Sequence, residues 1–400
     1  MLFGGTVGIE QLILSIYSSL ATFILLPIPL FVLMGEVIFH SGIAVRVVDV
    51  LDKWLGRLPG RLGLLAVSAG TVFSTLTGTS VASTAMLGSI LVPEMEKRGY
   101  KKPMTLGPIL GSGGLAIMIP PSSLAVLLGA ISEISVGKIL IAIIVPGLLM
   151  AVLYSAYIII RCWYQPSIAP RYEVGRTPLS EKLKGTVRYV LPLGLIIFLV
   201  IGLIVLGVAT PSEAAASGTI GAFFLAAVYR GLSWDVTKKS IRGTLRITGM
   251  IFLIIAAARA FSQILSFSGA TRGLTELATS LPASPILIVI AMQVVVLIMG
   301  GFMSLIAIMM ITLPIFVPVI VDLGFDPVWF ATIFLLNIEM ALTTPPLGMN
   351  LYVMKGVIPA HMTMGDIIKA ALPFLYCDAI AMALIIAFPS LALWLPSLMR

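Results

Sequence analysis

Long apolar runs fill most of the chain, and short polar or basic segments separate them. Six runs contain no Asp, Glu, Lys or Arg and cover residues 62–93, 103–132, 139–160, 189–212, 214–229 and 277–321. Because a membrane-spanning helix needs about 20 apolar residues, the pattern predicts an all-α polytopic membrane protein. The expected spans lie near residues 20–40, 104–132, 138–161, 187–209, 211–229, 246–265, 327–356 and 366–395.

Two apolar runs are too long to form single straight helices across a membrane. Residues 62–95 and 284–321 would each form a helix of about 50 Å or more, against a hydrocarbon core of about 30 Å. Small or polar residues interrupt each run near its middle, TLTGTS up to Ser80 and GGFMS at 300–304. These interruptions predict two re-entrant helical hairpins.

A Pro-Pro pair interrupts two further apolar stretches, LAIMIPPSSLAVLLG and MALTTPPLGMNLYVM. Proline removes a backbone donor and clashes with the preceding turn, so each pair predicts a broken helix. The two pairs lie 225 residues apart, and the same offset relates Pro93 to Pro318 and Gly99 to Gly324. The sequence therefore predicts two repeats, each with a hairpin followed by a Pro-broken helix.

The composition fits a membrane protein and excludes a soluble enzyme. Of the 400 residues, 59% are apolar and 10% are charged, and the mean hydropathy is +1.12, whereas about a quarter of residues in soluble proteins are charged. Cys162 and Cys377 lie far apart in or beside apolar segments, so they predict no disulfide framework and no metal site. No Lys or Arg precedes the first apolar run, which argues against a cleaved signal peptide.

The positions of the basic residues predict the topology. With the N-terminus outside, 21 of the 25 Lys and Arg residues lie on the cytoplasmic side, as the positive-inside rule requires. Because most of the basic residues set the orientation of the chain in the membrane, the net charge of +8 does not indicate a nucleic-acid partner. This orientation also places the two hairpins on opposite faces, so the halves are expected to be inverted-topology repeats. Inverted repeats with broken helices are typical of secondary transporters whose site lies near the bilayer midplane.

A basic amphipathic stretch, RVVDVLDKWLGRLPGR at 46–61, precedes the first hairpin and is expected to lie along the cytoplasmic interface as an arm. The sequence thus divides into five segments. They are an N-terminal scaffold helix and arm at 1–61; the first transport half at 62–135, with hairpin 62–95 and broken helix 104–132; scaffold helices, a cytoplasmic loop at 161–188 and a second arm within 136–283; the second transport half at 284–357, with hairpin 284–321 and broken helix 327–356; and a C-terminal helix at 358–400.

Hydroxyl side chains and glycines gather at the hairpin tips and the helix breaks. Unwound backbone at membrane depth is tolerated where protein buries it or water lines it, and its carbonyls can bind Na⁺ while half-helix N-termini attract anions. The groups at these four places are Thr77, Gly78, Thr79, Ser80, Ser83, Ser112, Gly113, Gly114, Ser122, Ser123, Gly300, Gly301, Ser304, Thr343, Thr344 and Asn350. Hydroxyls and carbonyls are the hard oxygen ligands that small cations prefer.

Five motifs in order carry a family resemblance from about residue 25 to the C-terminus. They are FSTLTGTSVASTAMLGSILVPEMEKRGY, IPPSSLAV, ATPSEAAASGTIGAF, MMITLPIFVPV and NIEMALTTPPLGMNL. The chain resembles the large membrane subunit of a tripartite ATP-independent periplasmic (TRAP) transporter. The resemblance implies an elevator-type transporter of the bacterial inner membrane, driven by a Na⁺ gradient and needing no other cofactor. It also implies a small four-helix membrane subunit and a soluble periplasmic substrate-binding protein as partners.

The resemblance also implies site residues and a substrate class. One Na⁺ site would be formed by Thr77, Gly78, Thr79, Ser80, Ser112, Gly113 and Pro120, and a second by Gly300, Gly301, Ser304, Thr343, Thr344 and Pro345. The substrate, an organic acid such as a C4-dicarboxylate, sialic acid or another sugar acid, would lie between the tips, near Ser80, Ser83, Ser123, Ser304, Asn350 and Arg259. Many relatives carry an acidic residue near the tip positions that Ser83 and Ser304 occupy here.

Four ionisable residues lie within apolar segments, Glu36, Arg259, Glu339 and Asp378, where a charge is costly and is usually paired or functional. Arg259 is the one embedded cation that could reach an anionic substrate; a structural ion pair is the alternative. Other functions remain open from the residues themselves. They are a stand-alone Na⁺–dicarboxylate or related anion symporter of similar architecture, a channel or scaffold protein, and an intramembrane serine hydrolase built on Ser80 or Ser112. No HExxH motif or nucleophile elbow supports an enzyme.

Overall fold

The computed structural model describes residues 5–56, 58–77, 80–170, 178–269, 272–273, 276, 280 and 282–399. Within these ranges the regular structure is helical and contains no strand. Six described segments are long and apolar enough to cross a membrane, and the bent pair α6 and α7 makes a seventh. They are Phe23–His40, Val136–Tyr164, Leu179–Val205, Trp234–Leu265, Leu305–Asp322 and Met364–Ala387, with Lys102–Met118 and Ser123–Ser132 as the bent pair. The all-α polytopic membrane fold is therefore confirmed.

The first half contains a helical hairpin and a broken helix where both were expected. The hairpin consists of α4 (Arg61–Thr77) and α5 (Ser80–Lys97). The broken helix consists of α6 (Lys102–Met118) and α7 (Ser123–Ser132), which meet at an angle of 44° across the Pro-Pro pair. Gly99 ends the hairpin in the left-handed region at φ 75°, a conformation that glycine adopts without steric cost.

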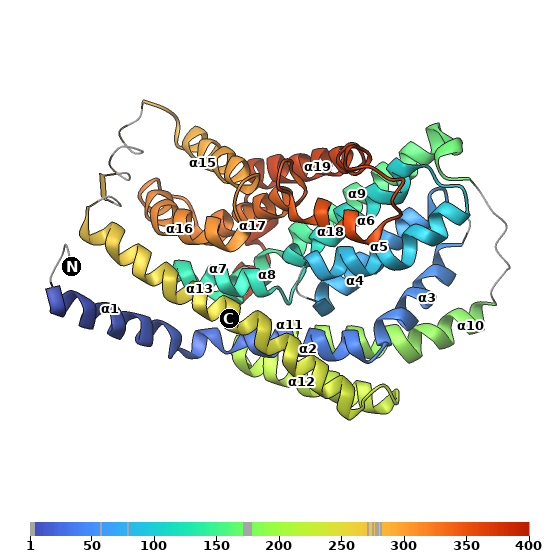
Figure 1. Cartoon of the computed structure of the whole chain (residues 1–400), viewed down its shortest axis with the longest axis horizontal. Helices are drawn as coiled ribbons and strands as arrows, with labels where there is room; N and C mark the ends of the chain where they lie inside the picture. The colour runs from blue at the N-terminus through green and yellow to red at the C-terminus, as the bar shows by residue number, and fades with distance from the viewer. Residues whose placement is uncertain are drawn as a thin grey trace.

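The second half repeats this order. Its hairpin consists of α15 (Pro285–Gly300) and α16 (Leu305–Asp322), and its broken helix of α17 (Pro327–Thr343) and α18 (Met349–Val357). Helices α16 and α17 begin and end 225 residues after α5 and α6, and Gly324, at φ 78°, takes the place of Gly99. The hairpin α4–α5 lies toward one end of the long axis and the hairpin α15–α16 toward the other (Figure 1).

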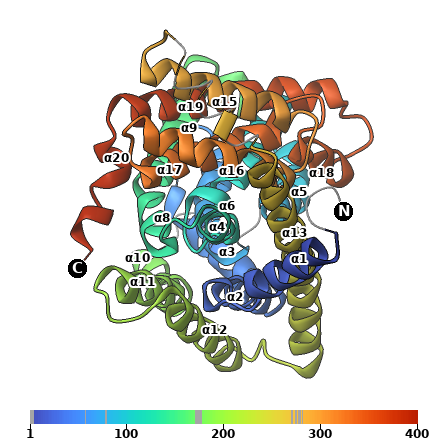
Figure 2. The same cartoon turned by 90° about the vertical axis from the view of Figure 1, so that its left-hand side faces the viewer.

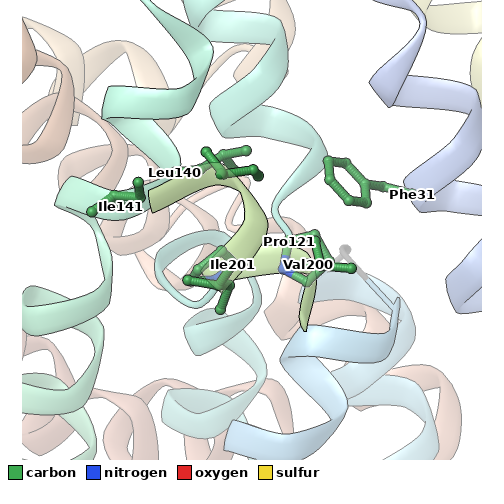
Figure 3. Close-up of a pocket in the computed structure, with 8 residues that line it drawn as sticks. Phe31, Pro121, Leu140, Ile141, Val200 and Ile201 are labelled. Carbon is green, nitrogen blue, oxygen red and sulfur yellow. The ribbon is translucent and has the colours of Figure 1, made fainter. Parts of the chain in front are cut away.

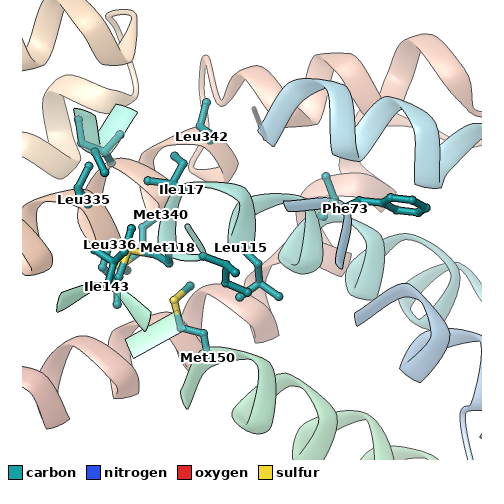
Figure 4. Close-up of a cluster of buried hydrophobic side chains, with 14 of the residues drawn as sticks. Phe73, Leu115, Ile117, Met118, Ile143, Met150, Leu335, Leu336, Met340 and Leu342 are labelled. Atoms are coloured by element: carbon teal, nitrogen blue, oxygen red, sulfur yellow. The ribbon is translucent and has the colours of Figure 1, made fainter. Parts of the chain in front are cut away.

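The two broken helices form the centre of the fold. Every residue of α6 from Met104 onward and every residue of α17 from Val328 onward is buried, as expected for helices that are apolar on all sides. Figure 4 shows Leu115, Ile117 and Met118 of α6 beside the side chains of α17, among them Leu336 and Met340. The hairpins and α19 (Met364–Ala387) pack around this pair.

Helix α19 packs closely on α6 because α6 carries glycines at the contact. A methyl group added at Gly107 would lie 2.6 Å from the carbonyl oxygen of Ala370, and one added at Gly111 would lie 2.5 Å from the Phe374 ring. Lys102 of α6 also pairs with Asp366 of α19 at 2.7 Å. The C-terminal helix is therefore fixed to the centre of the fold.

A layer of outer helices lies on the side of the molecule opposite α19 (Figure 2). It contains α1 (Gly5–Leu20), α2 (Pro27–His40), α11 (Leu191–Val205), α12 (Pro211–Val228) and α13 (Trp234–Phe267). Large apolar side chains on it face outward, as Phe198 and Phe224 do. A lipid-facing surface explains their exposure, since lipid replaces water as the solvent there.

Several boundaries differ from the expected spans. The span expected at residues 138–161 covers residues 136–164 and is divided into two helices, α8 (Val136–Ala142) and α9 (Ile144–Tyr164). Pro146 in the first turn of α9 supplies no N–H to bond the preceding turn. The span expected at residues 366–395 is shorter than predicted, because α19 ends at Ala387 before Pro389 and α20 (Ser390–Leu393) follows as a separate short helix. Helix α13 has 34 residues rather than the expected 20 or so, and α1 precedes the predicted first span.

The predicted arm is a helix, α3 (Ile43–Leu55), which packs on α4. Arg61 joins it to the hairpin: its guanidinium pairs with the Asp52 carboxylate at 2.7 Å and donates to the Asp52 carbonyl oxygen at 2.9 Å. Helix α10 (Leu179–Gly185) lies beside α3 (Figure 1). The expected second arm, within residues 270–283, falls largely outside the described residues.

Candidate functional site

The first hairpin tip places three hydroxyl side chains in the interior. Ser80, Ser83 and Thr84 lie in the first turns of α5 and are at most 4% exposed. Thr84 faces α6, because a methyl group added at Gly113 would lie 2.0 Å from the Thr84 Oγ1 atom. The tip thus packs directly on the backbone of the broken helix at Gly113.

Asn350 connects the two halves of the chain at this tip. It lies in the first turn of α18, is fully buried, and donates from Nδ2 to the Ser80 Oγ atom at 2.6 Å. The residues that follow the second Pro-Pro pair therefore contact the first hairpin. Helix α7, which follows the first Pro-Pro pair, in turn contacts α16 of the second hairpin.

Three buried oxygen atoms around this contact lack a hydrogen-bond donor within the described part of the chain. They are Ser83 Oγ, Thr84 Oγ1 and Asn350 Oδ1. Buried polar groups in native proteins are almost always bonded, and each exception needs an explanation such as an ion or a water. A cation or a polar substrate group at this place would supply the missing partners.

The hydroxyls of Ser112 and Ser122 in the first broken helix form hydrogen bonds with backbone groups three residues away. Ser112 donates to the Ile109 carbonyl at 3.2 Å and packs against Gly70 of α4. Ser122 caps α7 by accepting from the Ala125 N–H at 3.3 Å. Ser123, which follows, is only 4% exposed. The N-terminus of α7 is therefore buried at the break.

The side chains of Pro120 and Pro121 face away from the polar residues. They line a small apolar crevice with Phe31 of α2, Leu140 of α8 and Val200 of α11 (Figure 3). Pro120 can therefore offer only its carbonyl oxygen to a cation. The crevice lies between the break and the outer helices.

The second hairpin tip and the second break lie against each other. Gly301 accepts from the Leu347 N–H at 3.1 Å, and a methyl group added to Gly301 would lie 3.3 Å from the Pro345 carbonyl oxygen. The Thr343 and Thr344 hydroxyls both donate to the Met340 carbonyl, at 3.1 and 2.7 Å. Ser304 is exposed and caps α16 by accepting from the Ala307 N–H at 3.4 Å.

Replacing Gly300 with valine is expected to displace the second tip. A methyl group at Gly300 would lie 2.2 Å from Ala341 Cβ and 3.1 Å from its Cα, and overpacking of this kind costs about 1–3 kcal/mol. The melting temperature should fall and uptake should decrease. Gly202→Val is the control, because nothing lies within 4 Å of its added methyl group. Equal effects of the two changes would contradict the close packing of the tip.

The embedded carboxyl groups have defined surroundings. Glu339 of α17 is 1% exposed, and its carboxyl packs against Gly114 of α6, where an added methyl group would overlap it at 1.2 Å. Asp378 of α19 accepts a hydrogen bond from the Tyr154 hydroxyl of α9. Glu36 pairs with His40 one turn later at 3.2 Å. The Glu339 and Asp378 carboxyls form no ion pair with any described residue.

Some predicted site residues lie outside what the structure describes, and one site residue was not predicted. Gly78, Thr79 and the side chains of Thr77 and Arg259 are not described. Thr84 was missed, although its spacing of four residues from Ser80 puts both hydroxyls on one face of α5. That spacing is the signal in the sequence that could have identified it.

The comparisons with known proteins agree with this architecture. The family described as "Tripartite ATP-independent periplasmic transporter, DctM component" matches residues 1–391. The C4-dicarboxylate TRAP transporter large permease protein DctM of Pseudomonas aeruginosa is 33% identical over 393 residues, which cover 98% of this chain and 90% of the relative. The ectoine TRAP transporter large permease protein TeaC of Halomonas elongata is 30% identical over 406 residues, covering 100% of this chain and 92% of the relative.

A solved structure supports the fold. The chain resembles the Alcanivorax borkumensis YdaH transporter, whose crystal structure was described as having an unusual topology, with a TM-score of 0.68. The match covers 97% of this chain and 89% of that one at 15% sequence identity, so it bears on the fold alone. The family match and the two relatives decide the class: the chain belongs to the DctM family, the large permease subunits of tripartite ATP-independent periplasmic transporters.

Proposed function

We propose that this chain is the Na⁺-coupled transport subunit for an organic acid anion in the bacterial inner membrane. As a TRAP large permease it is a multi-pass membrane transporter and not an enzyme, and its family implies a substrate-binding protein and a small membrane subunit as partners. The observation that carries the proposal is the contact between Asn350 and Ser80, with unpartnered buried oxygens beside it.

The residues at the first tip fit Na⁺ as the coupling ion. The oxygens of Ser80, Ser83 and Thr84 and the carbonyls near Gly113 are hard, neutral ligands, which suit a monovalent cation. Gly113 lets the α5 hydroxyls approach the α6 backbone closely. The second Na⁺ is proposed to lie between Gly301 and Thr344, where the tip and the break are already in contact.

The anion is proposed to bind through helix N-termini, hydroxyl groups and the charge of bound Na⁺. The first hairpin, the first broken helix and the second hairpin contain no Lys or Arg within residues 62–93, 103–132 and 277–321. Helices α5, α7 and α18 begin at or beside Ser80, Ser123 and Asn350, and a helix N-terminus favours negative charge. The relatives are named for C4-dicarboxylate and ectoine, so we limit the substrate to the class of small organic acids.

Movement is proposed to occur by an elevator mechanism. The two hairpins and broken helices, packed around α6 and α17, would move as one body against the outer helices α2, α11, α12 and α13. Helix α3 would act as the hinge arm, since Arg61 ties it to the hairpin. The helix boundaries that recur at an offset of 225 residues support two inverted repeats, the architecture in which alternating access is achieved by moving one unit against another.

Reconstitution with and without the binding protein tests this function against a stand-alone anion symporter. Proteoliposomes with this chain and its small subunit should accumulate the acid only when its loaded binding protein is present. The control is the same vesicle with an unrelated, empty binding protein. Uptake at the full rate without any binding protein would favour the stand-alone symporter.

A further inference from the structure

A hollow on the face assigned to the cytoplasm lies between the arm helix α3 and the start of the helix that becomes α11. Its walls come from both elements, which lie side by side in Figure 1. The residues that line it are Arg46, Asp49, Val50, Lys53, Glu181, Lys184, Gly185, Arg188 and Tyr189. Four of these side chains are basic and two are acidic. We call this place the arm hollow.

The basic groups of the arm hollow are not neutralised by its carboxylates. Lys53 forms an ion pair with the Glu181 carboxylate at 2.6 Å, and this hydrogen bond raises the pKa of Lys53. Burial raises the pKa of Asp49. Arg46, Lys184 and Arg188 form no ion pair with any residue that the structure describes. The hollow therefore presents an excess of positive charge.

An aromatic ring holds the two guanidinium groups in place. The Arg46 and Arg188 guanidiniums lie over the Tyr189 ring at 5.7 and 5.6 Å from its centroid. The ring also contacts Tyr229, which follows the last residue of α12, and nearby Trp54 donates to the Thr186 hydroxyl at 2.7 Å. Stacked guanidiniums are pre-organised donors that match the geometry of a phosphate.

Exposed apolar side chains lie within two positions along the chain of residues that line the arm hollow. They are Val45 on α3 and Leu183, Val187 and Leu191 along the helix that leads into the membrane, each 48–59% exposed. A small soluble anion would leave these apolar side chains exposed, whereas the acyl chains of a bound lipid would cover them. The basic groups and the apolar side chains therefore match the two parts of a phospholipid, its anionic headgroup and its acyl chains.

We propose that the arm hollow binds the phosphate headgroup of an anionic phospholipid of the cytoplasmic leaflet, with Arg46, Lys184 and Arg188 as its donors. Basic pockets at the cytoplasmic ends of membrane helices bind such headgroups. Because the hollow is shared by the arm and an outer helix, the bound lipid ties the two together at the place where the arm begins.

Native mass spectrometry of the purified chain, titrated with phosphatidylglycerol or phosphatidylcholine, tests the proposal. The wild-type chain should retain phosphatidylglycerol preferentially. Arg46→Gln with Arg188→Gln should weaken that binding by about 30-fold, since each basic group near the surface contributes about fivefold. Arg242→Gln with Arg246→Gln, two exposed residues of α13 outside the hollow, removes the same charge and should leave binding unchanged.

Lys184→Gln serves as a second variant, because Lys184 is exposed and lies over none of the aromatic rings that the structure describes, so its loss leaves the stacked arginines in place. It should weaken phosphatidylglycerol binding by several-fold while the melting temperature stays constant. Equal losses in the α13 variant would overturn the proposal by showing non-specific charge attraction. Equal retention of the two lipids, or competition by inorganic phosphate at millimolar concentration with no preference for lipid, would also overturn it.

Discussion

Replacing Asn350 with alanine is expected to lower uptake by about fivefold to a hundredfold, because the change removes a donor and leaves a buried acceptor unpaired. Asn350 is fully buried and supplies the hydrogen bond to Ser80 that connects the two halves at the proposed site. Its Oδ1 atom has no described partner and is proposed to contact the substrate or its ion. Breaking a buried hydrogen bond costs about 1–3 kcal/mol, and each 1.4 kcal/mol is a factor of ten in rate or binding.

Initial uptake rates in proteoliposomes give the measurement for this variant. Met349→Ala is the matched control, because Met349 lies next to Asn350 on α18 but is 44% exposed. The control should transport like the wild type, and both proteins should be inserted at equal amounts. Normal uptake by Asn350→Ala would show that the contact with Ser80 has no role in transport.

Replacing Thr84 with valine is expected to have opposite effects on stability and on Na⁺ binding. Valine has the same shape but lacks the hydroxyl, and the Thr84 Oγ1 atom is buried with no described partner beside Gly113. Without Na⁺, loss of an unsatisfied buried hydroxyl should raise the melting temperature, since such a group costs about 1–3 kcal/mol. With Na⁺, the stabilisation that the bound ion gives to the wild type should largely disappear.

Melting temperatures in NaCl and in choline chloride at equal ionic strength measure both effects. Thr332→Val is the control, because Thr332 of α17 is also buried but its hydroxyl donates to the Val328 carbonyl at 2.9 Å. This variant should be somewhat destabilised and should keep its Na⁺ response. If Thr84→Val kept the full Na⁺ response, Thr84 would not be a ligand.

The features that could be predicted from the sequence carry a local signal. Pro-Pro pairs break helices wherever they occur, so the ends of α6 and α17 could be expected from Pro120 and Pro345. The helix ends at Thr77 and Gly300 could be expected from the interruptions in the sequence near these residues, together with the length of each apolar run. Gly99 and Gly324 mark the reversal after each hairpin because only glycine adopts the left-handed conformation readily.

The features that could not be predicted depend on packing between distant segments. Asn350 was a candidate by composition, but its bond to Ser80 joins residues 270 positions apart, and no local pattern encodes that pairing. The approach of Thr84 to Gly113 and of Glu339 to Gly114 likewise follows from how α5, α6 and α17 pack. The division of residues 136–164 into two helices was not predicted, because a proline within an apolar run either bends or breaks a helix and the sequence around Pro146 does not distinguish the two.

Dependence of uptake on a Na⁺ gradient tests the central proposal most directly. Proteoliposomes with this chain, its small subunit and the loaded binding protein should accumulate radiolabelled organic acid when Na⁺ is outside and choline is inside. Accumulation should stop when choline replaces Na⁺ on both sides, and ATP should have no effect. Undiminished uptake with choline on both sides would contradict Na⁺ coupling and the two proposed Na⁺ sites.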